Sequence, residues 1–177
     1  MAHIALCVYE NMSDSVKKHA DKKLEKTGSL GEIFQLLALN EDVYFATDTM
    51  VSKFLLKETL LPYVTKQRIA ILVSLDNGCK MCAGVHKQLA RALGVSEVEI
   101  EEIALGIDAL SCSEAEKRLL HFCIRASKKD NYKIMKEDIE VIKAFGYSEK
   151  EIFEAVCIVG YFNYINTLSN TFGLGSE

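Results

Sequence analysis

The sequence predicts an all-α protein, and three observations support this class. The 177 residues include one proline, Pro62, so little in the chain interrupts a helix. Apolar residues recur at helical spacing in several stretches, and none alternates convincingly with polar residues as a half-buried strand would. Ser-x-x-Glu sequences, which are typical of helix N-termini, precede several of the helical stretches.

In the first half of the chain, turn residues separate the stretches with helical spacing. The first helix is expected to begin near Ser13 or Asp14, and Gly28 and Gly31 then interrupt the chain. Helices are predicted over residues 12–27, 32–39, 42–60, about 66–75 and about 79–93.

Two short polar segments set the boundaries around the helix at about 66–75. Residues 61–65 are predicted to form a turn, with Thr65 as the N-cap of that helix. Residues 76–78, Asp-Asn-Gly, form a second turn, where Asp76 or Asn77 can cap the next helix. Gly94 then ends that helix.

The second half continues with helices over 114–127, 136–145 and 148–170, and we expect residues 172–177 to fray. Residues 92–102 and 144–154 are identical at seven of eleven positions. Each copy ends one helix at a glycine and begins another with a Ser-x-x-Glu box. This recurrence indicates a candidate internal helical repeat, although helix corners can also converge on the same chemistry.

Length and charge restrict the class of protein further. The chain is long enough for one domain with a proper core, and its net charge is −4 with acids and bases interspersed. No basic block suggests a nucleic-acid partner, and no apolar run suggests a membrane span. The first ten residues do not resemble a signal peptide, so we expect a cytoplasmic protein.

The cysteines carry the main functional signal. Cys79 and Cys82 form a Cys-x-x-Cys pair, and His86 follows four residues later. On one helix these three side chains would share a face. In the cytoplasm thiols stay reduced unless they are catalytic, which favours a working redox pair. Four further cysteines lie singly among apolar residues, and most of them are expected to pack in the core: Cys7, Cys112, Cys123 and Cys157.

This arrangement can perform peroxide chemistry without a cofactor. Near the N-terminus of a helix, the helix dipole and unpaired N–H groups favour a thiolate. A thiolate oxidised to a sulfenic acid condenses with a neighbouring thiol to give a disulfide. We expect Cys82, next to His86, to attack the peroxide and Cys79, nearer the exposed helix end, to resolve the sulfenic acid. His86 would accept or return the proton.

Other interpretations fit the same residues less well. The pair and His86 could supply three ligands to zinc, but no second Cys-x-x-Cys or His-x-x-x-His sequence supplies a fourth, so we expect no metal. A thioredoxin-type pair would follow a strand, whereas the segment before Cys79 is predicted to be helical.

Residues 66–86 also resemble a known family. Val73-Ser74, Asn77-Gly78-Cys79, Cys82 and His86 resemble the core of the alkylhydroperoxidase D-like (AhpD-like) and carboxymuconolactone decarboxylase superfamily. The segments 144–149, 154–156 and 161–166 are similar to its peroxidase-related branch. The resemblance covers about residues 15–174, so we expect a single AhpD-like domain over 1–177, with residues 1–12 as an N-terminal extension.

The resemblance implies an AhpD-like helical bundle that assembles into homo-oligomers, trimers or hexamers. It also implies peroxide reduction in which the second cysteine attacks and the first resolves. In better-studied members, a glutamate about three turns before the first cysteine joins a proton relay with the histidine. Gln67 occupies that position here, and an amide can form hydrogen bonds but does not carry a proton at neutral pH.

The sequence therefore predicts a cofactor-free oxidoreductase that reduces hydroperoxides in antioxidant defence, with a protein or small dithiol as reductant. The expected catalytic residues are Cys82, Cys79 and His86, with Gln67 orienting a water or the histidine. Either Glu58, Glu116 or another acid replaces the missing carboxylate, or His86 acts alone, or turnover is weak. The alternatives are disulfide exchange with a protein partner, or a non-catalytic oligomeric binding protein with an incomplete relay.

Overall fold

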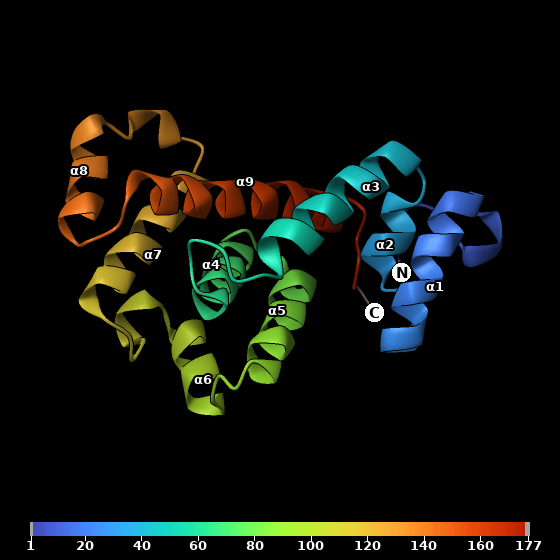
Figure 1. Cartoon of the computed structure of the whole chain (residues 1–177), viewed down its shortest axis with the longest axis horizontal. Coiled ribbons are helices and arrows are strands. Elements are labelled where there is room, and N and C mark those ends of the chain that lie inside the picture. The colour runs from blue at the N-terminus through green and yellow to red at the C-terminus, as the bar shows by residue number, and fades with distance from the viewer. Residues whose placement is uncertain (1, 176–177) are drawn as a thin grey trace. The chain divides into compact units, whose positions relative to one another are not determined.

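The structure is a computed structural model that describes residues 2–175, with the backbone alone at residues 26 and 27. Its regular elements within this range are all helical, which confirms the predicted class (Figure 1). The α-helices are α1 (Asp14–Thr27), α2 (Glu32–Leu37), α3 (Glu41–Met50), α4 (Tyr63–Asp76), α5 (Lys80–Ala92), α6 (Glu97–Leu105), α7 (Glu114–Ser127), α8 (Lys136–Ala144) and α9 (Glu149–Thr171). Short 3-10 turns lie at Tyr9–Asn11, Ile107–Ala109 and Asn131–Lys133, and a π-helical turn at Val51–Leu55 follows α3.

The chain divides into two compact units. One comprises Met1–Leu56 with Ser169–Glu177, and the other comprises Lys57–Leu168. The second unit contains α4 to α8 and most of α9, and it holds every residue that the sequence proposes for catalysis. The single domain expected over 1–177 stays a prediction.

Helix α4 is the buried centre of the second unit. It packs against α5, α6 and α7, and its residues Ile69, Ala70, Ile71 and Val73 are fully buried. A helix that is apolar on all sides is typical of a core position. Four polar side chains of α4 are buried as well, and each needs a partner to offset the loss of water: Thr65, Lys66, Gln67 and Ser74.

Lys66 finds its partner in α9. Its Nζ lies 2.9 Å from Glu154 Oε1 and also donates to the carbonyl of Lys57 at 2.9 Å. Glu154 in turn accepts hydrogen bonds from the backbone N–H groups of Leu60 and Leu61, each at 3.2 Å, and from the Thr59 hydroxyl. Burial alone would raise the pKa of Glu154, but these hydrogen bonds lower it below its usual value. The Lys66–Glu154 ion pair therefore holds residues 57–61 in contact with α9.

The caps predicted from serines are confirmed. The side chains of Ser13, Ser96 and Ser113 each accept the N–H three residues later, and Ser148 and Glu151 form a reciprocal capping box. The two similar segments, 92–102 and 144–154, both form a helix–glycine–helix corner, with φ of 89° at Gly94 and 101° at Gly146. The likeness ends at the corner, because α6 has 9 residues and α9 has 23.

Two helix boundaries differ from the sequence prediction. Helix α4 begins at Tyr63, so Thr65 lies within its first turn, where its hydroxyl donates to Glu116 at 2.7 Å and does not cap the helix. The helix predicted over 42–60 ends at Leu55, because residues 57–61 turn to contact Lys66 and Glu154.

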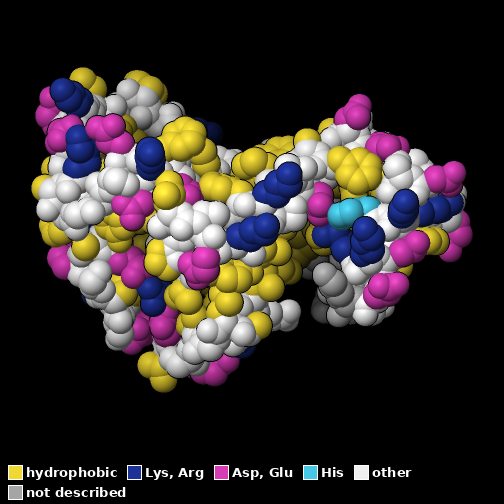
Figure 2. Space-filling view, viewed as in Figure 1, with side chains coloured by type: hydrophobic (Ala, Val, Ile, Leu, Met, Phe, Trp, Pro, Cys, Tyr) yellow, Lys and Arg dark blue, Asp and Glu magenta, His cyan; other side chains and the backbone are white. Residues whose placement is uncertain are grey.

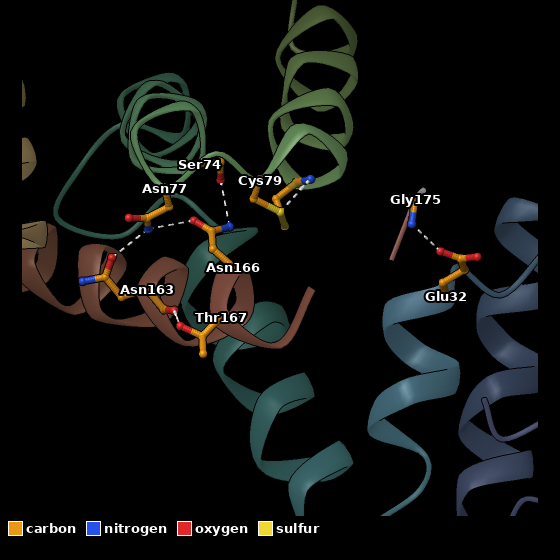
Figure 3. Close-up of a disulfide and its surroundings, with 9 residues drawn as sticks. Glu32, Ser74, Asn77, Cys79, Asn163, Asn166, Thr167 and Gly175 are labelled. Carbon is orange, nitrogen blue, oxygen red and sulfur yellow. Dashed lines mark hydrogen bonds between the residues drawn. A yellow bond between two sulfur atoms is a disulfide. The ribbon is translucent and has the colours of Figure 1, made fainter. Parts of the chain in front are cut away.

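The C-terminal segment is also better fixed than expected. Within the first unit, Leu174 is buried, and its N–H donates to the carbonyl of Ser169 at 2.9 Å. The N–H of Gly175 donates to Glu32 at 2.6 Å (Figure 3). The prediction that this segment frays is thus wrong for residues 172–175. Residues 176 and 177 lie outside the described range.

The surface carries mixed charge. On the face drawn in Figure 2, acidic and basic side chains are interspersed and not gathered into blocks of one sign. No helix within residues 2–175 is both long enough and apolar enough to cross a membrane.

Candidate functional site

The turn between α4 and α5 places the first cysteine. Gly78 has a φ of 68°, a left-handed conformation that favours glycine and lets the chain reverse within two residues. The N–H of Cys79 then donates to the carbonyl of Ser74 at 2.8 Å, which closes the turn. Cys79 is itself the N-cap of α5, because its Sγ accepts the N–H of Cys82 at 3.4 Å. The predicted caps, Asp76 and Asn77, are therefore wrong.

The structure brings the two thiol residues together at the start of α5. Cys79 and Cys82 form a disulfide, and their Cα atoms lie 5.4 Å apart, within the normal range for a bridged pair. The two residues are 2% and 4% exposed, so both are buried. The greater exposure expected for Cys79 is not observed.

His86 lies two helical turns after Cys79 on α5, and Gln67 of α4 is its hydrogen-bond partner. The distance between His86 Nδ1 and Gln67 Oε1 is 2.7 Å. The ring also packs edge-on against Phe162 of α9, with centroids 4.8 Å apart. Burial lowers the pKa of His86 from 6.5 to about 4. The imidazole is therefore neutral at pH 7.

The hydrogen bond also selects the tautomer of His86. Because an amide oxygen only accepts, Nδ1 carries the proton and donates it to Gln67. In the neutral ring the other nitrogen, Nε2, then has a free lone pair and can accept a proton. The contact is the one that orientation of the histidine by Gln67 would require, and that role stays a prediction.

Gln67 has a second polar atom with no visible partner. The residue is fully buried, and its Nε2 makes no hydrogen bond within the described part of the protein. An unpaired buried amide costs about 1–3 kcal/mol, so such groups usually have a water or ligand beside them.

The two acids that the sequence analysis named as replacements for the relay carboxylate form contacts elsewhere. Glu58 accepts the N–H of Tyr63 at 3.0 Å, and Glu116 pairs with Arg68 at 2.7 Å.

Two asparagines of α9 belong to the same region, and sequence reasoning gave them no role. Asn77 Nδ2 donates to Asn163 Oδ1 at 2.9 Å and to Asn166 Oδ1 at 3.0 Å, as Figure 3 shows. Asn166 Nδ2 donates to Ser74 Oγ at 3.2 Å. The available signal is an asparagine pair, at i and i+3, at the end of the largely apolar stretch 155–166 of α9.

The remaining cysteines lie apart from this pair, and each has no disulfide partner. Cys7 and Cys123 are buried, and burial raises the pKa of Cys123 to about 12. Burial also raises the pKa of Cys112 and of Cys157. Core packing is thus observed for Cys7 and Cys123, whereas Cys112 and Cys157 are only partly buried. Among residues 2–175, no three His, Cys, Asp or Glu side chains gather in a way that could hold a metal ion.

Comparisons with known proteins place this arrangement in a wider class. Residues 42–123 match the model of the Carboxymuconolactone decarboxylase family. No curated protein matches the chain.

Solved structures match over nearly the whole chain. One is an uncharacterized peroxidase-related protein with an alkylhydroperoxidase AhpD core from Ralstonia eutropha JMP134, with a TM-score of 0.89 and 18% identity over 98% of this chain and 90% of that chain. Another is an uncharacterized peroxidase-related protein from Silicibacter sp. TM1040, with a TM-score of 0.88 and 21% identity over the same shares, 98% and 90%. The debrominase Bmp8, solved with 2,3,4-tribromopyrrole, has a TM-score of 0.68 and 18% identity over 93% of this chain and 86% of that one.

The fold is therefore that of the AhpD-like, peroxidase-related proteins, as the resemblance implied. The match of residues 42–123 to the Carboxymuconolactone decarboxylase family model agrees with the family recognised from the sequence.

Proposed function

We propose that this protein is a thiol-dependent peroxidase that reduces hydroperoxides through the Cys79–Cys82 pair. The observation that carries the proposal is the pairing of two cysteines at the start of α5, one helical turn before a neutral histidine. A pair that bridges readily can cycle between dithiol and disulfide, which is the electron balance that peroxide reduction requires. The AhpD-like fold supports the same class of activity.

The first step oxidises Cys82. Its thiol proton passes to Nε2 of His86, and the thiolate sulfur attacks the nearer oxygen of the hydroperoxide. An S–O bond forms while the O–O bond breaks, and the leaving alkoxide or hydroxide takes a proton to become an alcohol or water. Because its pKa is about 4, protonated His86 returns the proton readily, but it is a weak base for removing it.

The second step forms the disulfide. The Cys79 thiolate attacks Cys82 Sγ, the S–S bond forms, and the S–O bond breaks with release of hydroxide, which is protonated to water. A protein or small dithiol then donates two electrons and two protons by thiol–disulfide exchange and restores both thiols. No step requires a cofactor.

Gln67 has two proposed roles in this cycle. Its Oε1 holds the tautomer of His86, while its buried Nε2 donates to a water or to an oxygen of the bound peroxide. Such a donor would stabilise negative charge on the leaving oxygen. The amide cannot take the proton onward, so we expect turnover to be slower than in an enzyme with a carboxylate at this position.

An assay with several reductants tests the proposal. Hydrogen peroxide or an organic hydroperoxide should be consumed in the presence of a dithiol, and Cys82→Ser should abolish this consumption. Cys79→Ser should leave a sulfenic acid on Cys82. Unchanged turnover in Cys82→Ser would show that the proposal is wrong. Since the debrominase Bmp8 shares the fold, a brominated pyrrole belongs among the substrates tested.

Two alternatives have distinct outcomes. If the protein mainly exchanges disulfides with a partner, its rate on a protein disulfide will exceed its rate on peroxide. If it is a non-catalytic binding protein, titration of Cys82 should give an ordinary thiol pKa of about 8.5. For the active protein we further propose a cytoplasmic location and a trimeric or hexameric assembly.

A further inference from the structure

We propose that Asn166 is a positioning residue that holds Cys79 within reach of Cys82 and thereby sets how readily their disulfide forms. The inference rests on the proposed function only in taking this pair as the redox centre. It assigns to α9 a role in the chemistry at the start of α5, through the turn that carries Cys79.

Asn166 contacts two residues of that turn, Ser74 and Asn77. Its Oδ1 accepts from Asn77 Nδ2 at 3.0 Å, and its Nδ2 donates to Ser74 Oγ at 3.2 Å (Figure 3). Asn166 is 1% exposed and Ser74 is fully buried, so water does not compete for the hydrogen bond between them. Asn163 adds a second contact to Asn77 at 2.9 Å and is itself held by its donation to the carbonyl of Ser127 at 3.2 Å.

Ser74 connects Asn166 to Cys79. The backbone carbonyl of Ser74 accepts the N–H of Cys79 at 2.8 Å, and Asn166 holds the side chain of the same serine. Cys79 is the N-cap of α5: its carbonyl accepts the N–H of Ala83 at 3.0 Å, but its own N–H bonds to Ser74 and not within the helix. The position of Cys79 therefore depends on the turn as well as on α5, whereas Cys82 lies within α5.

This difference makes the bridging step sensitive to Asn166. Closing a disulfide between two thiols depends on how well they are already held in bonding geometry. In exchange with glutathione disulfide, the two protein thiols are oxidised to one disulfide while the S–S bond of glutathione disulfide breaks to give two molecules of glutathione. A looser turn lowers the equilibrium constant of this reaction because the open dithiol gains freedom that the disulfide lacks.

The test measures that equilibrium constant in glutathione buffers of varied ratio for the full-length protein. Asn166→Leu keeps the volume of the side chain and removes both hydrogen bonds. We expect it to lower the constant about tenfold, which corresponds to a reduction potential about 30 mV higher. The matched control is Thr167→Ala on the same helix, because the Thr167 hydroxyl donates to the carbonyl of Asn163 within α9 and does not reach the turn.

A second variant tests the route through Ser74. Ser74→Ala removes the side-chain contact with Asn166 and keeps the carbonyl that receives the N–H of Cys79. We expect a smaller fall in the constant, and the Asn166→Leu/Ser74→Ala double variant should equal Asn166→Leu alone. If Asn166→Leu does not fold, Ser74→Ala carries the test by itself.

The inference is overturned if the constant of Asn166→Leu stays within twofold of wild type, if Thr167→Ala shifts it equally, or if the two turn variants add independently. The measurement uses no peroxide, so it is separate from the proposed function. A wild-type protein that consumes no peroxide but shows the expected shift would disprove the peroxidase activity and leave this inference standing.

Discussion

At the scale of single residues, the hydrogen bond between Gln67 and His86 distinguishes this site. An amide fixes the orientation of the imidazole, with Nδ1 to Oε1 at 2.7 Å, but it does not stabilise an imidazolium as a carboxylate would. Burial then holds the pKa of His86 at about 4, and no opposing charge raises it. The proposed site thus combines a well-oriented imidazole with a low affinity for the proton.

Replacing Gln67 by glutamate should raise the affinity of His86 for a proton. A carboxylate at the same distance from His86 would favour the protonated ring and could carry the proton onward, so we expect Gln67→Glu to raise kcat/KM for peroxide about tenfold. Gln67→Met is the matched control, because it keeps the length of the side chain and should lower the rate. An equal or lower rate in Gln67→Glu would show that another group completes the relay.

The low pKa of His86 also predicts how stability varies with pH. The unfolded chain binds a proton at His86 below pH 6.5, whereas the folded protein does so only near pH 4. The free energy of unfolding should therefore fall as the pH drops from 6.5 to 4, by on the order of 3 kcal/mol from this group. Urea denaturation across this range measures the slope.

His86→Asn provides the control for this slope. Without the imidazole, the decrease between pH 6.5 and 4 should be largely absent, and only the loss from carboxylates such as Glu154 should remain at lower pH. A slope in His86→Asn as steep as in wild type would mean that other groups cause it.

At the scale of elements, α4 carries the polar groups that organise the second unit. It is buried on all sides, yet it presents Lys66 to Glu154 and Gln67 to His86. A buried ion pair costs desolvation energy at both groups, and it is sensitive to the loss of one partner. The Lys66–Glu154 pair also fixes residues 57–61, which lead into α4.

Breaking this pair should destabilise the protein strongly. In Lys66→Met the Glu154 carboxylate stays buried without its cation, and we expect a loss of about 3 kcal/mol in the free energy of unfolding. The Lys66→Met/Glu154→Gln double variant should recover part of this loss, because it leaves no uncompensated charge. Equilibrium unfolding in urea gives the comparison, and simple additivity of the two substitutions would contradict the account.

The sequence predicted the helices and the thiol pair well because both leave local signals. Serine caps, glycine stops and a Cys-x-x-Cys-x-x-x-His spacing depend on residues close together in the chain. The errors have a different origin. The sequence predicts caps at Thr65 and at Asp76 or Asn77, but Thr65 bonds to Glu116 and Asn77 bonds to the α9 asparagines. The network around Ser74 joins residues about ninety positions apart, so no local pattern reveals it.

At the scale of the whole molecule, the assembly expected from the family resemblance can be measured directly. Light scattering coupled to size exclusion should give three or six times the 19.8 kDa mass of one chain. The same measurement on the oxidised and reduced protein will show whether assembly depends on the Cys79–Cys82 bond. A mass of one chain in both states would contradict the proposed trimer or hexamer.

The central claim is that Cys79 and Cys82 exchange electrons with a peroxide. The most direct measurement adds one equivalent of hydroperoxide to the fully reduced protein and counts thiols while mass spectrometry locates the product. We predict the loss of two thiols per chain and a Cys79–Cys82 disulfide, with no such reaction in Cys82→Ser. If the thiols stay reduced while the peroxide persists, or if Cys82→Ser reacts as fast as wild type, the pair is not the peroxide-reducing centre.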